Sequence, residues 1–150
     1  MGNRRYDQRS ASDRPGFVLP SPEIMTKIIQ GNDTDLLVNQ AEDFGKELAN
    51  RKLTTNQIRA FFGQVKQIEL SVNRENRKLE EPLDDSDRRK LILLKPKLAY
   101  QAKRHTSVKP LEQVLSSAID LIKNRKHFVN FVDFFEAILA YHKAEGGRDQ

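Results

Sequence analysis

The feature that most constrains the fold is the segment from His127 to Lys143, which is apolar on almost every side when drawn as a helix. Its apolar residues recur at helical spacing and are Phe128, Phe131, Val132, Phe134, Phe135, Ile138, Leu139 and Tyr141. Only Asn130, Asp133 and Glu136, three residues apart, form a narrow polar stripe. A helix of this kind must lie in the centre of a bundle or in a protein interface. The segment therefore predicts an all-α fold built around it.

The rest of the chain after Pro20 also shows helical periodicity, with apolar stripes at three- and four-residue spacing and no convincing strand alternation. We therefore predict a compact all-α helical bundle of about five to six helices, forming a single domain over residues 21–150. The predicted helices span about 22–29, 35–50, 55–78, 87–105, 110–124 and 127–143.

Helix-start signals support these boundaries. Ser21 precedes a proline and an acid, which favours an N-cap. Thr54 and Gln57 have the spacing of a capping box, and Ser86 can cap the fourth helix. Pro96 should kink or split that helix, because proline lacks a backbone donor and clashes with the preceding turn.

Residues 1–20 are predicted to be a flexible basic arm. They contain four arginines among Ser, Asn, Gln, Gly and Pro, with too little apolar surface to offset the entropy of ordering. The arm is either a disordered terminus or a segment that orders on nucleic acid. The chain also lacks cysteine and any apolar run long enough to span a bilayer. These features indicate a soluble, cytoplasmic protein that does not enter a membrane.

The sequence does not suggest catalysis, a metal site or a cofactor. Each of the histidines (His105, His127 and His142) falls near a predicted helix end, where the helix dipole favours a capping or surface role. No pair of histidines has metal-ligand spacing, and no glycine-rich phosphate loop is present. The acids between Glu80 and Asp87 lack the ligand order of a calcium loop. We therefore expect a protein that is not an enzyme.

The basic residues are concentrated between Ser86 and Lys109. This stretch holds eight Lys and Arg residues and one acid, Asp87, in a chain of net charge +5. A focused basic surface is the electrostatic footprint of a polyanion partner. Because acids are missing from the stretch, we expect little neutralisation by neighbouring ion pairs. A break at Pro96 could also present backbone amides to phosphate.

A second candidate phosphate site surrounds Thr54 and Thr55. Arg51, Lys52 and Arg59 flank the predicted N-terminus of a helix there. Free backbone amides at a helix N-terminus, together with cations, favour phosphate binding. Contacts of this kind hold a nucleic-acid backbone without reading its sequence.

Three segments together resemble the small subunit of type III-A CRISPR effector complexes, the Csm small subunit family. They occur in the family's order and spacing, and the resemblance covers about residues 36–147. The first runs Lys52-Leu53-Thr54-Thr55-Asn56-Gln57-Ile58-Arg59. The second is Leu94-Lys95-Pro96-Lys97-Leu98-Ala99-Tyr100, followed by Arg104. The third is Phe131-Val132-Asp133-Phe134-Phe135-Glu136-Ala137-Ile138, followed by Ala140-Tyr141-His142-Lys143.

The resemblance implies a compact helical protein without catalytic activity. Copies of it would stack along the inside of an RNA-guided antiviral complex, beside the backbone subunits and below the large cyclase-bearing subunit. They would contact the backbone of guide and target RNA without reading bases. On this reading Lys52 and Arg59 are the first candidate RNA contacts, and Tyr100 and the third segment belong to the core. The remaining candidates are Arg51, Thr55, Lys95, Lys97, Lys103 and Arg104, with Thr55 alternatively serving only to cap a helix.

Two other functions stay open at the level of sequence. One is a helical protein-interaction adaptor whose basic patch meets an acidic partner. The other is a DNA-binding regulator, which is disfavoured because no helix-turn-helix with a recognition helix stands out. If copies stack, the acidic connector from Glu80 to Asp87 and the basic stretch after it are a candidate complementary pair, since a repeating head-to-tail contact needs two different surfaces.

Overall fold

The computed structural model describes residues 18–74, 76 and 78–146, and within them it is an all-α bundle without strands. This confirms the predicted fold class. Most of the predicted N-terminal arm lies outside the described residues. The helices are α1 (Pro22–Ile29), α2 (Thr34–Asn50), α3 (Thr55–Arg74), α4 (Asp85–Ile92), α5 (Leu94–Arg104), the short 3-10 helix η3 (Thr106–Val108), α6 (Lys109–Asp120) and α7 (Arg125–Ala144).

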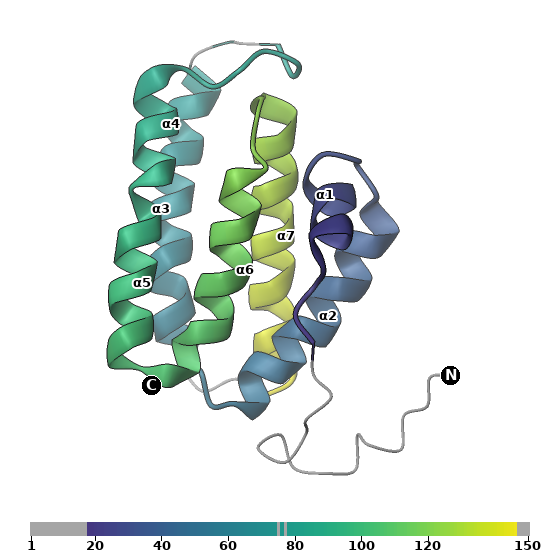
Figure 1. Cartoon of the computed structure of the whole chain (residues 1–150), viewed down its shortest axis with the longest axis vertical. Helices are drawn as coiled ribbons and strands as arrows, with labels where there is room; N and C mark the ends of the chain where they lie inside the picture. Colours follow the sequence, from purple (N-terminus) through teal and green to yellow (C-terminus); the bar gives the residue numbers. More distant parts are fainter. Residues whose placement is uncertain (1–17, 75, 77, 147–150) are drawn as a thin grey trace.

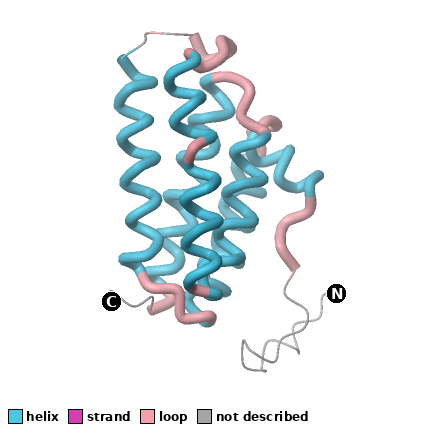
Figure 2. Tube along the Cα trace, turned by 60° about the vertical axis from the view of Figure 1, so that its left-hand side comes forward, coloured by secondary structure: helices cyan, strands magenta, loops and turns pink. Residues whose placement is uncertain are grey.

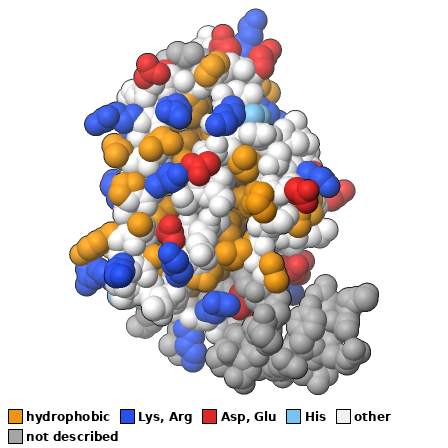
Figure 3. Space-filling model, in the orientation of Figure 1, with side chains coloured by type: hydrophobic (Ala, Val, Ile, Leu, Met, Phe, Trp, Pro, Cys, Tyr) orange, Lys and Arg blue, Asp and Glu red, His pale blue; other side chains and the backbone are white. Residues whose placement is uncertain are grey.

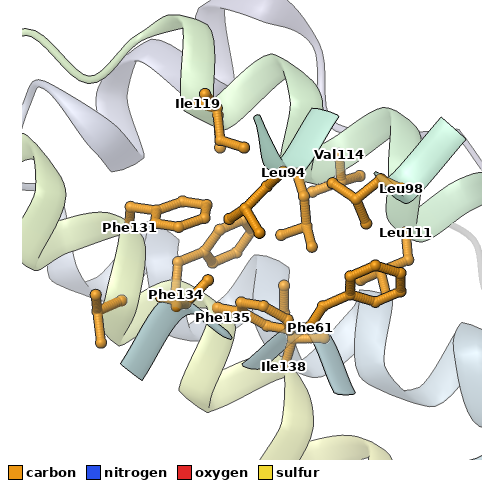
Figure 4. Close-up of a cluster of buried hydrophobic side chains, with 14 of the residues drawn as sticks. Phe61, Leu94, Leu98, Leu111, Val114, Ile119, Phe131, Phe134, Phe135 and Ile138 are labelled. Carbon is orange, nitrogen blue, oxygen red and sulfur yellow. The ribbon is translucent and has the colours of Figure 1, made fainter. Parts of the chain in front are cut away.

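The last helix, α7, lies in the middle of the bundle, as its apolar surface predicted. It packs against α1, α2, α3 and α6, and Figure 1 shows it between α6 on one side and α1 and α2 on the other. Phe131, Phe134, Phe135 and Ile138 are at most 1% exposed and point into the core drawn in Figure 4. Each fully buried side chain of this size contributes about 1.5–3 kcal/mol to stability.

The polar stripe on α7 divides into an exposed and a buried part. Asp133 and Glu136 are exposed, as a narrow solvent-facing stripe requires. Asn130 is buried, and its side-chain amide donates hydrogen bonds to the carbonyl oxygen of Ile29 (2.9 Å) and to Oδ1 of Asn32 (2.7 Å). Since a buried amide is costly unless it is hydrogen-bonded, these bonds hold the end of α1 against α7.

The predicted N-caps of α1 and α3 are confirmed, and the predicted N-cap of α4 is wrong. Ser21 caps α1, and Thr54 and Gln57 form the reciprocal capping box at α3, with Gln57 N donating to Thr54 Oγ1 (3.1 Å) and Thr54 N donating to Gln57 Oε1 (2.9 Å). The cap of α4 is Asp84, whose carboxylate accepts from Asp87 N at 2.8 Å, and Ser86 lies inside the helix. Asp84 has the better acceptor, because a carboxylate also interacts favourably with the helix dipole.

The fourth predicted helix is split, but the break lies at Leu93, three residues before Pro96. Pro96 occupies the first turn of α5, where a missing backbone donor costs no intrahelical hydrogen bond. A proline ring would instead clash with the carbonyl four residues earlier, at Ile92. The chain avoids this clash by ending α4 at Ile92 and restarting, and Figure 2 shows the break as a short loop segment inside a helical column.

The break sends α4 and α5 to different neighbours. Helix α4 packs against α3, whereas α5 packs against α6 and η3. Few contacts join α3 and α5, and a groove lies between them. Helix α3 itself ends at Arg74, before the predicted Lys78, and Asn76 adopts a left-handed conformation (φ 52°) that favours a helix stop.

Candidate nucleic-acid interface

A groove of about 750 Å³ separates the first half of α3 from α5. One wall comes from the first family-like segment and the other from the second, so two stretches about 40 residues apart in sequence meet here. Val108 of η3 also lines the groove. The lining residues are Thr54, Asn56, Gln57, Ala60, Phe61, Gln64, Pro96, Lys97, Tyr100, Gln101 and Val108.

The α5 wall carries an exposed aromatic ring, Tyr100, and one cation, Lys97, and a second cation, Arg104, lies beside the ring. Lys97 Nζ donates to Gln64 Oε1 across the groove at 3.1 Å. The guanidinium carbon of Arg104 lies 5.7 Å from the ring centroid of Tyr100, and an Arg104 nitrogen donates to the Tyr100 hydroxyl at 3.4 Å. Lys97, Tyr100 and Arg104 share one helix face, because residues three, four and seven apart lie on the same side.

The assignment of Tyr100 to the core was wrong, since the residue is 59% exposed. Its neighbours Leu98 and Ala102 carry the buried face of α5, while Tyr100 points outward over the groove. The third family-like segment does belong to the core. Five of its residues, Phe131, Val132, Phe134, Phe135 and Ile138, are buried.

Lys52 lies in the turn between α2 and α3. The backbone there forms a Schellman-type stop, in which Leu53 N donates to Leu48 O (3.1 Å) and Lys52 N donates to Ala49 O (3.0 Å). This geometry puts Lys52 in the left-handed region at φ 68°. The side chain is exposed, and Thr54, two residues on, lines the groove.

His142 fixes this turn from α7. The residue is fully buried, and its Nε2 lies 2.5 Å from the carbonyl oxygen of Leu53, so Nε2–H donates to that oxygen. The sequence interpretation of His142 as a capping or surface residue was therefore wrong. Its position in the last turn of α7 suggested the dipole role, but the packing of α7 against α2 buries that turn.

Two of the predicted RNA contacts, Thr55 and Arg51, become weaker candidates because of the residues around them. Thr55 is fully buried beneath the α3 N-terminus, so its hydroxyl cannot reach RNA at the surface, and we remove it from the candidate contacts. Arg51 is exposed, and its Nε donates to Oε2 of buried Glu47 at 2.7 Å. An arginine that neutralises a buried carboxylate is costly to divert, so we rank Arg51 below Lys52.

The remaining predicted cations lie outside the groove. Lys95 faces α6 and pairs with Asp120 at 2.5 Å. Arg59 is exposed on the outer side of α3, on the face that Lys66 shares one heptad later. Lys103 is exposed on α5 but does not line the groove. The structure thus places Lys97 and Arg104 on one face of α5, one on each side of Tyr100, and Lys52 two residues before the lining residue Thr54. Arg59, Lys95 and Lys103 lie apart from them.

The expectation that the basic stretch would have few ion pairs is correct with two exceptions. Lys95 pairs with Asp120, and Lys109 pairs with Glu112 of its own helix at 3.2 Å. Within the described part of the chain, no ion pair involves Arg88, Arg89, Lys90, Lys97, Lys103 or Arg104. The one acid of the stretch, Asp87, is buried. Figure 3, drawn in the orientation of Figure 1, shows Lys and Arg side chains concentrated toward the side of α4 and α5, with Asp and Glu side chains among them.

Sequence reasoning missed the amides that line the groove. Asn56 and Gln64 come from α3 and Gln101 comes from α5. The spacing of Pro96, Lys97, Tyr100 and Gln101 could have identified one continuous face. No local signal could have shown that α3 lies opposite, because that depends on how the helices pack in three dimensions.

The groove contains no acid and no histidine among its lining residues. In the described ranges as a whole, no group of three or more His, Asp or Glu could hold a metal ion, and no helix is long and apolar enough to cross a membrane. Two groups with shifted pKa values, His127 and Asp133, lie outside the groove. Burial lowers the pKa of His127, and partial desolvation together with Glu136 raises the pKa of Asp133.

Comparison with known proteins points to one family. The sequence model of the family described as Csm2 Type III-A matches residues 31–148, which include every helix from α2 to α7. The chain is also similar to the CRISPR system Cms protein Csm2 of Streptococcus thermophilus, with 34% identity over 103 residues that make up 67% of this chain and 78% of that protein. No solved structure matches the chain. The family match spans both walls of the groove and confirms the resemblance found in the sequence, and the chain belongs to the Csm2 type III-A family.

Proposed function

We propose that this small subunit is a non-catalytic, RNA-lining component of a type III-A CRISPR interference complex, and that it holds the guide and target RNA by their backbone. The observation that carries this proposal is the convergence of the first two family-like segments on one groove. Lys97 lines that groove, Arg104 lies beside the lining residue Tyr100, and Lys52 precedes the lining residue Thr54 by two residues. A cationic surface without carboxylates attracts a polyanion.

The chemistry of these cations suits phosphate rather than base recognition. The Lys97 ammonium is a mobile point charge, and the Arg104 guanidinium offers a planar fork that matches two phosphate oxygens. Neither has an acidic partner within the described residues. Contacts to phosphate fix the position of a strand and carry no sequence information. The subunit would then accept any target that pairs with the guide.

Stacking of copies along the complex is the second part of the proposal. A repeating contact that does not close into a ring needs two different, complementary surfaces. Exposed Glu80 and Asp85 lie beside the start of α4, whereas the basic residues from Arg88 to Arg104 continue along α4 and α5. The acidic end of one copy would face the basic side of the next. Asp84 and Asp87 are used inside the fold, the first as a cap and the second as a buried residue.

Charge-removing variants test RNA binding by the purified full-length chain. Replacing Lys97 and Arg104 by glutamine should weaken binding of a guide–target duplex and lower the slope of log affinity against log salt by about two, close to one per lost phosphate contact. The loss should be equal for unrelated sequences. The control replaces Lys27 on α1 and Lys46 on α2 by glutamine, which removes the same charge from the far side of the bundle.

The same Lys97 and Arg104 variant distinguishes RNA binding from the alternative function of a protein-interaction adaptor. An unchanged salt slope in the Lys97 and Arg104 variant would reject backbone binding through the groove. Loss of a stoichiometric protein partner in that variant, with RNA binding intact and the complex resistant to nuclease, would support the adaptor function instead.

A further inference from the structure

We propose that the groove between α3 and α5 binds one unpaired nucleotide of the RNA, with the base stacked on Tyr100 and the adjoining phosphate between Lys97 and Arg104. The inference rests on the proposed function and deepens it. Contacts to RNA phosphates do not require an unpaired nucleotide, whereas stacking on Tyr100 does.

Tyr100 provides the stacking surface. Its ring is 59% exposed above a groove rather than buried, although tyrosine carries a large apolar surface. Pro96, one turn earlier on the same wall, extends this surface toward the α5 N-terminus. Arg104 lies against the ring, and guanidinium groups beside aromatic rings recur in sites that bind single-stranded nucleic acid. Exposed aromatics next to cations are the arrangement in which unstacked bases bind.

Amide side chains on both walls provide hydrogen-bonding groups that any base can use, with Asn56 and Gln57 on α3 and Gln101 on α5. Within the described residues, no hydrogen bond engages the side-chain amides of Asn56 and Gln101. Gln57 uses its carbonyl oxygen in the capping box, which leaves its NH₂ donors toward the groove. Each amide offers both donors and an acceptor. These groups can therefore satisfy different base edges, which agrees with binding that does not depend on sequence.

The charge of the groove favours a phosphate-bearing ligand. Lys97 is the one charged residue among the lining residues, Arg104 stands at the Tyr100 ring, and no carboxylate lines the wall. A volume of about 750 Å³ lies within the range of sites that enclose small ligands. A base inside an A-form duplex is covered by its stacked neighbours and cannot reach Tyr100, so the groove selects an unpaired nucleotide.

Photocrosslinking tests this inference. The full-length chain is bound to a guide–target duplex that carries 5-iodouridine either in a one-nucleotide bulge or in a fully paired position, and crosslinks are mapped by mass spectrometry. We expect a crosslink to Tyr100 from the bulged probe and none from the paired probe. Tyr100→Leu should abolish that crosslink and weaken binding of bulged RNA about tenfold, whereas Tyr100→Phe, which keeps the ring, should retain both.

The controls make each outcome decisive. Leu70→Ala removes a comparable apolar side chain from the outer face of α3, where Leu70 is 54% exposed, and should change nothing. A bulged probe that binds normally but crosslinks elsewhere, or equal crosslinking of the paired probe, overturns the nucleotide site while backbone binding stands. If the unmodified chain does not bind RNA at all, the proposed function itself is rejected. A change in subunit stoichiometry in Tyr100→Leu with the crosslink unaltered would assign the groove to a protein neighbour and overturn the inference.

Discussion

Lys52 holds a backbone conformation that lysine seldom adopts. The described residues with positive φ are Asn32, Asn76, Gly146 and Lys52, and the first three are types that tolerate the left-handed region. For a residue with a long side chain, this region costs roughly 1–2 kcal/mol. The Schellman-type bonds and the buried Leu53 impose the geometry. Unfavourable backbone of this kind is often retained at functional sites.

The variant Lys52→Gly separates folding from RNA binding at this position. Glycine adopts the left-handed turn without strain, so we expect a gain of about 1 kcal/mol in unfolding free energy, reduced in part by the greater entropy of the unfolded chain. The same variant should weaken RNA binding and lower the salt slope by about one. Chemical denaturation and a salt titration measure the two effects. A more stable variant with unchanged RNA affinity would remove Lys52 from the interface.

Asp133 predicts a small pH-dependent effect on stability. Asp133 is exposed but partly desolvated by the surrounding helices, and this partial desolvation, with a contribution from Glu136, raises the pKa of its carboxyl above the usual value. The folded chain therefore binds this proton more tightly than the unfolded chain, and the ionised carboxylate opposes folding above the raised pKa. Asp133→Asn should therefore be slightly more stable than the parent chain at pH 7, and the gain should be small because solvent screens a largely exposed carboxylate. The gain should disappear below about pH 4, where both states are protonated, and denaturation curves at the two pH values would show it.

At the scale of elements, the close approach of α2 and α7 depends on a glycine. A Cβ atom at Gly45 would lie 2.8 Å from Tyr141 Cβ and 2.9 Å from both His142 N and Ile138 O. Two of these atoms belong to the α7 backbone, which cannot move without shifting the helix. The contact sits next to His142, whose ring bonds the turn that carries Lys52. Packing of α2 on α7 therefore also sets the position of this turn, which precedes the lining residue Thr54.

Two glycine-to-alanine variants test this contact with an internal control. Gly45→Ala should lower the unfolding free energy by about 1–3 kcal/mol, because it overpacks the α2–α7 contact. Gly63→Ala, within α3, places its methyl group in open space and should raise it by about 0.5–1 kcal/mol, since alanine favours helix more than glycine. Thermal unfolding of both variants measures the difference. Equal effects at the two positions would contradict the close approach.

The elements were predictable from sequence to the extent that their signals are local. Two features depend only on residues close together in sequence, and both were predicted correctly. They are the capping box of Thr54 and Gln57 and the apolar stripe of α7. The position of the break at Leu93 was not predicted, because a proline can be accommodated either at a kink or in a new first turn. The exposure of Tyr100 and the burial of His142 depend on which helices face each other, which periodicity does not specify.

At the scale of the whole molecule, the charges are separated along α4 and α5. Glu80 and Asp85 are exposed at the start of α4, and six cations without an acidic partner in the described residues follow down to Arg104. A subunit with an acidic segment at the start of α4 and a basic side along α4 and α5 can attract further copies in one direction. Electrostatic complementarity of this type mainly sets register and the rate of association.

Combined replacement of Glu80 by lysine and Asp85 by asparagine tests this arrangement. The change leaves Asp84, the cap of α4, in place, so the fold should be nearly unaffected. We expect fewer copies per assembled complex, measured by native mass spectrometry at low salt, where screening of surface charges is weakest. The control is Glu23→Lys with Asp35→Asn, which alters the same charge on α1 and α2. Unchanged stoichiometry would show that stacking uses another surface.

The left-handed turn at Lys52 also has an evolutionary consequence. If Lys52 contacts RNA as we propose, folding and RNA binding favour different residues at this position, because glycine or asparagine suits the backbone while a cation binds a phosphate. Selection for interference would be needed to retain lysine. In a lineage whose complex no longer binds RNA, position 52 should be among the first of the interface positions to drift, and it should drift toward glycine or asparagine.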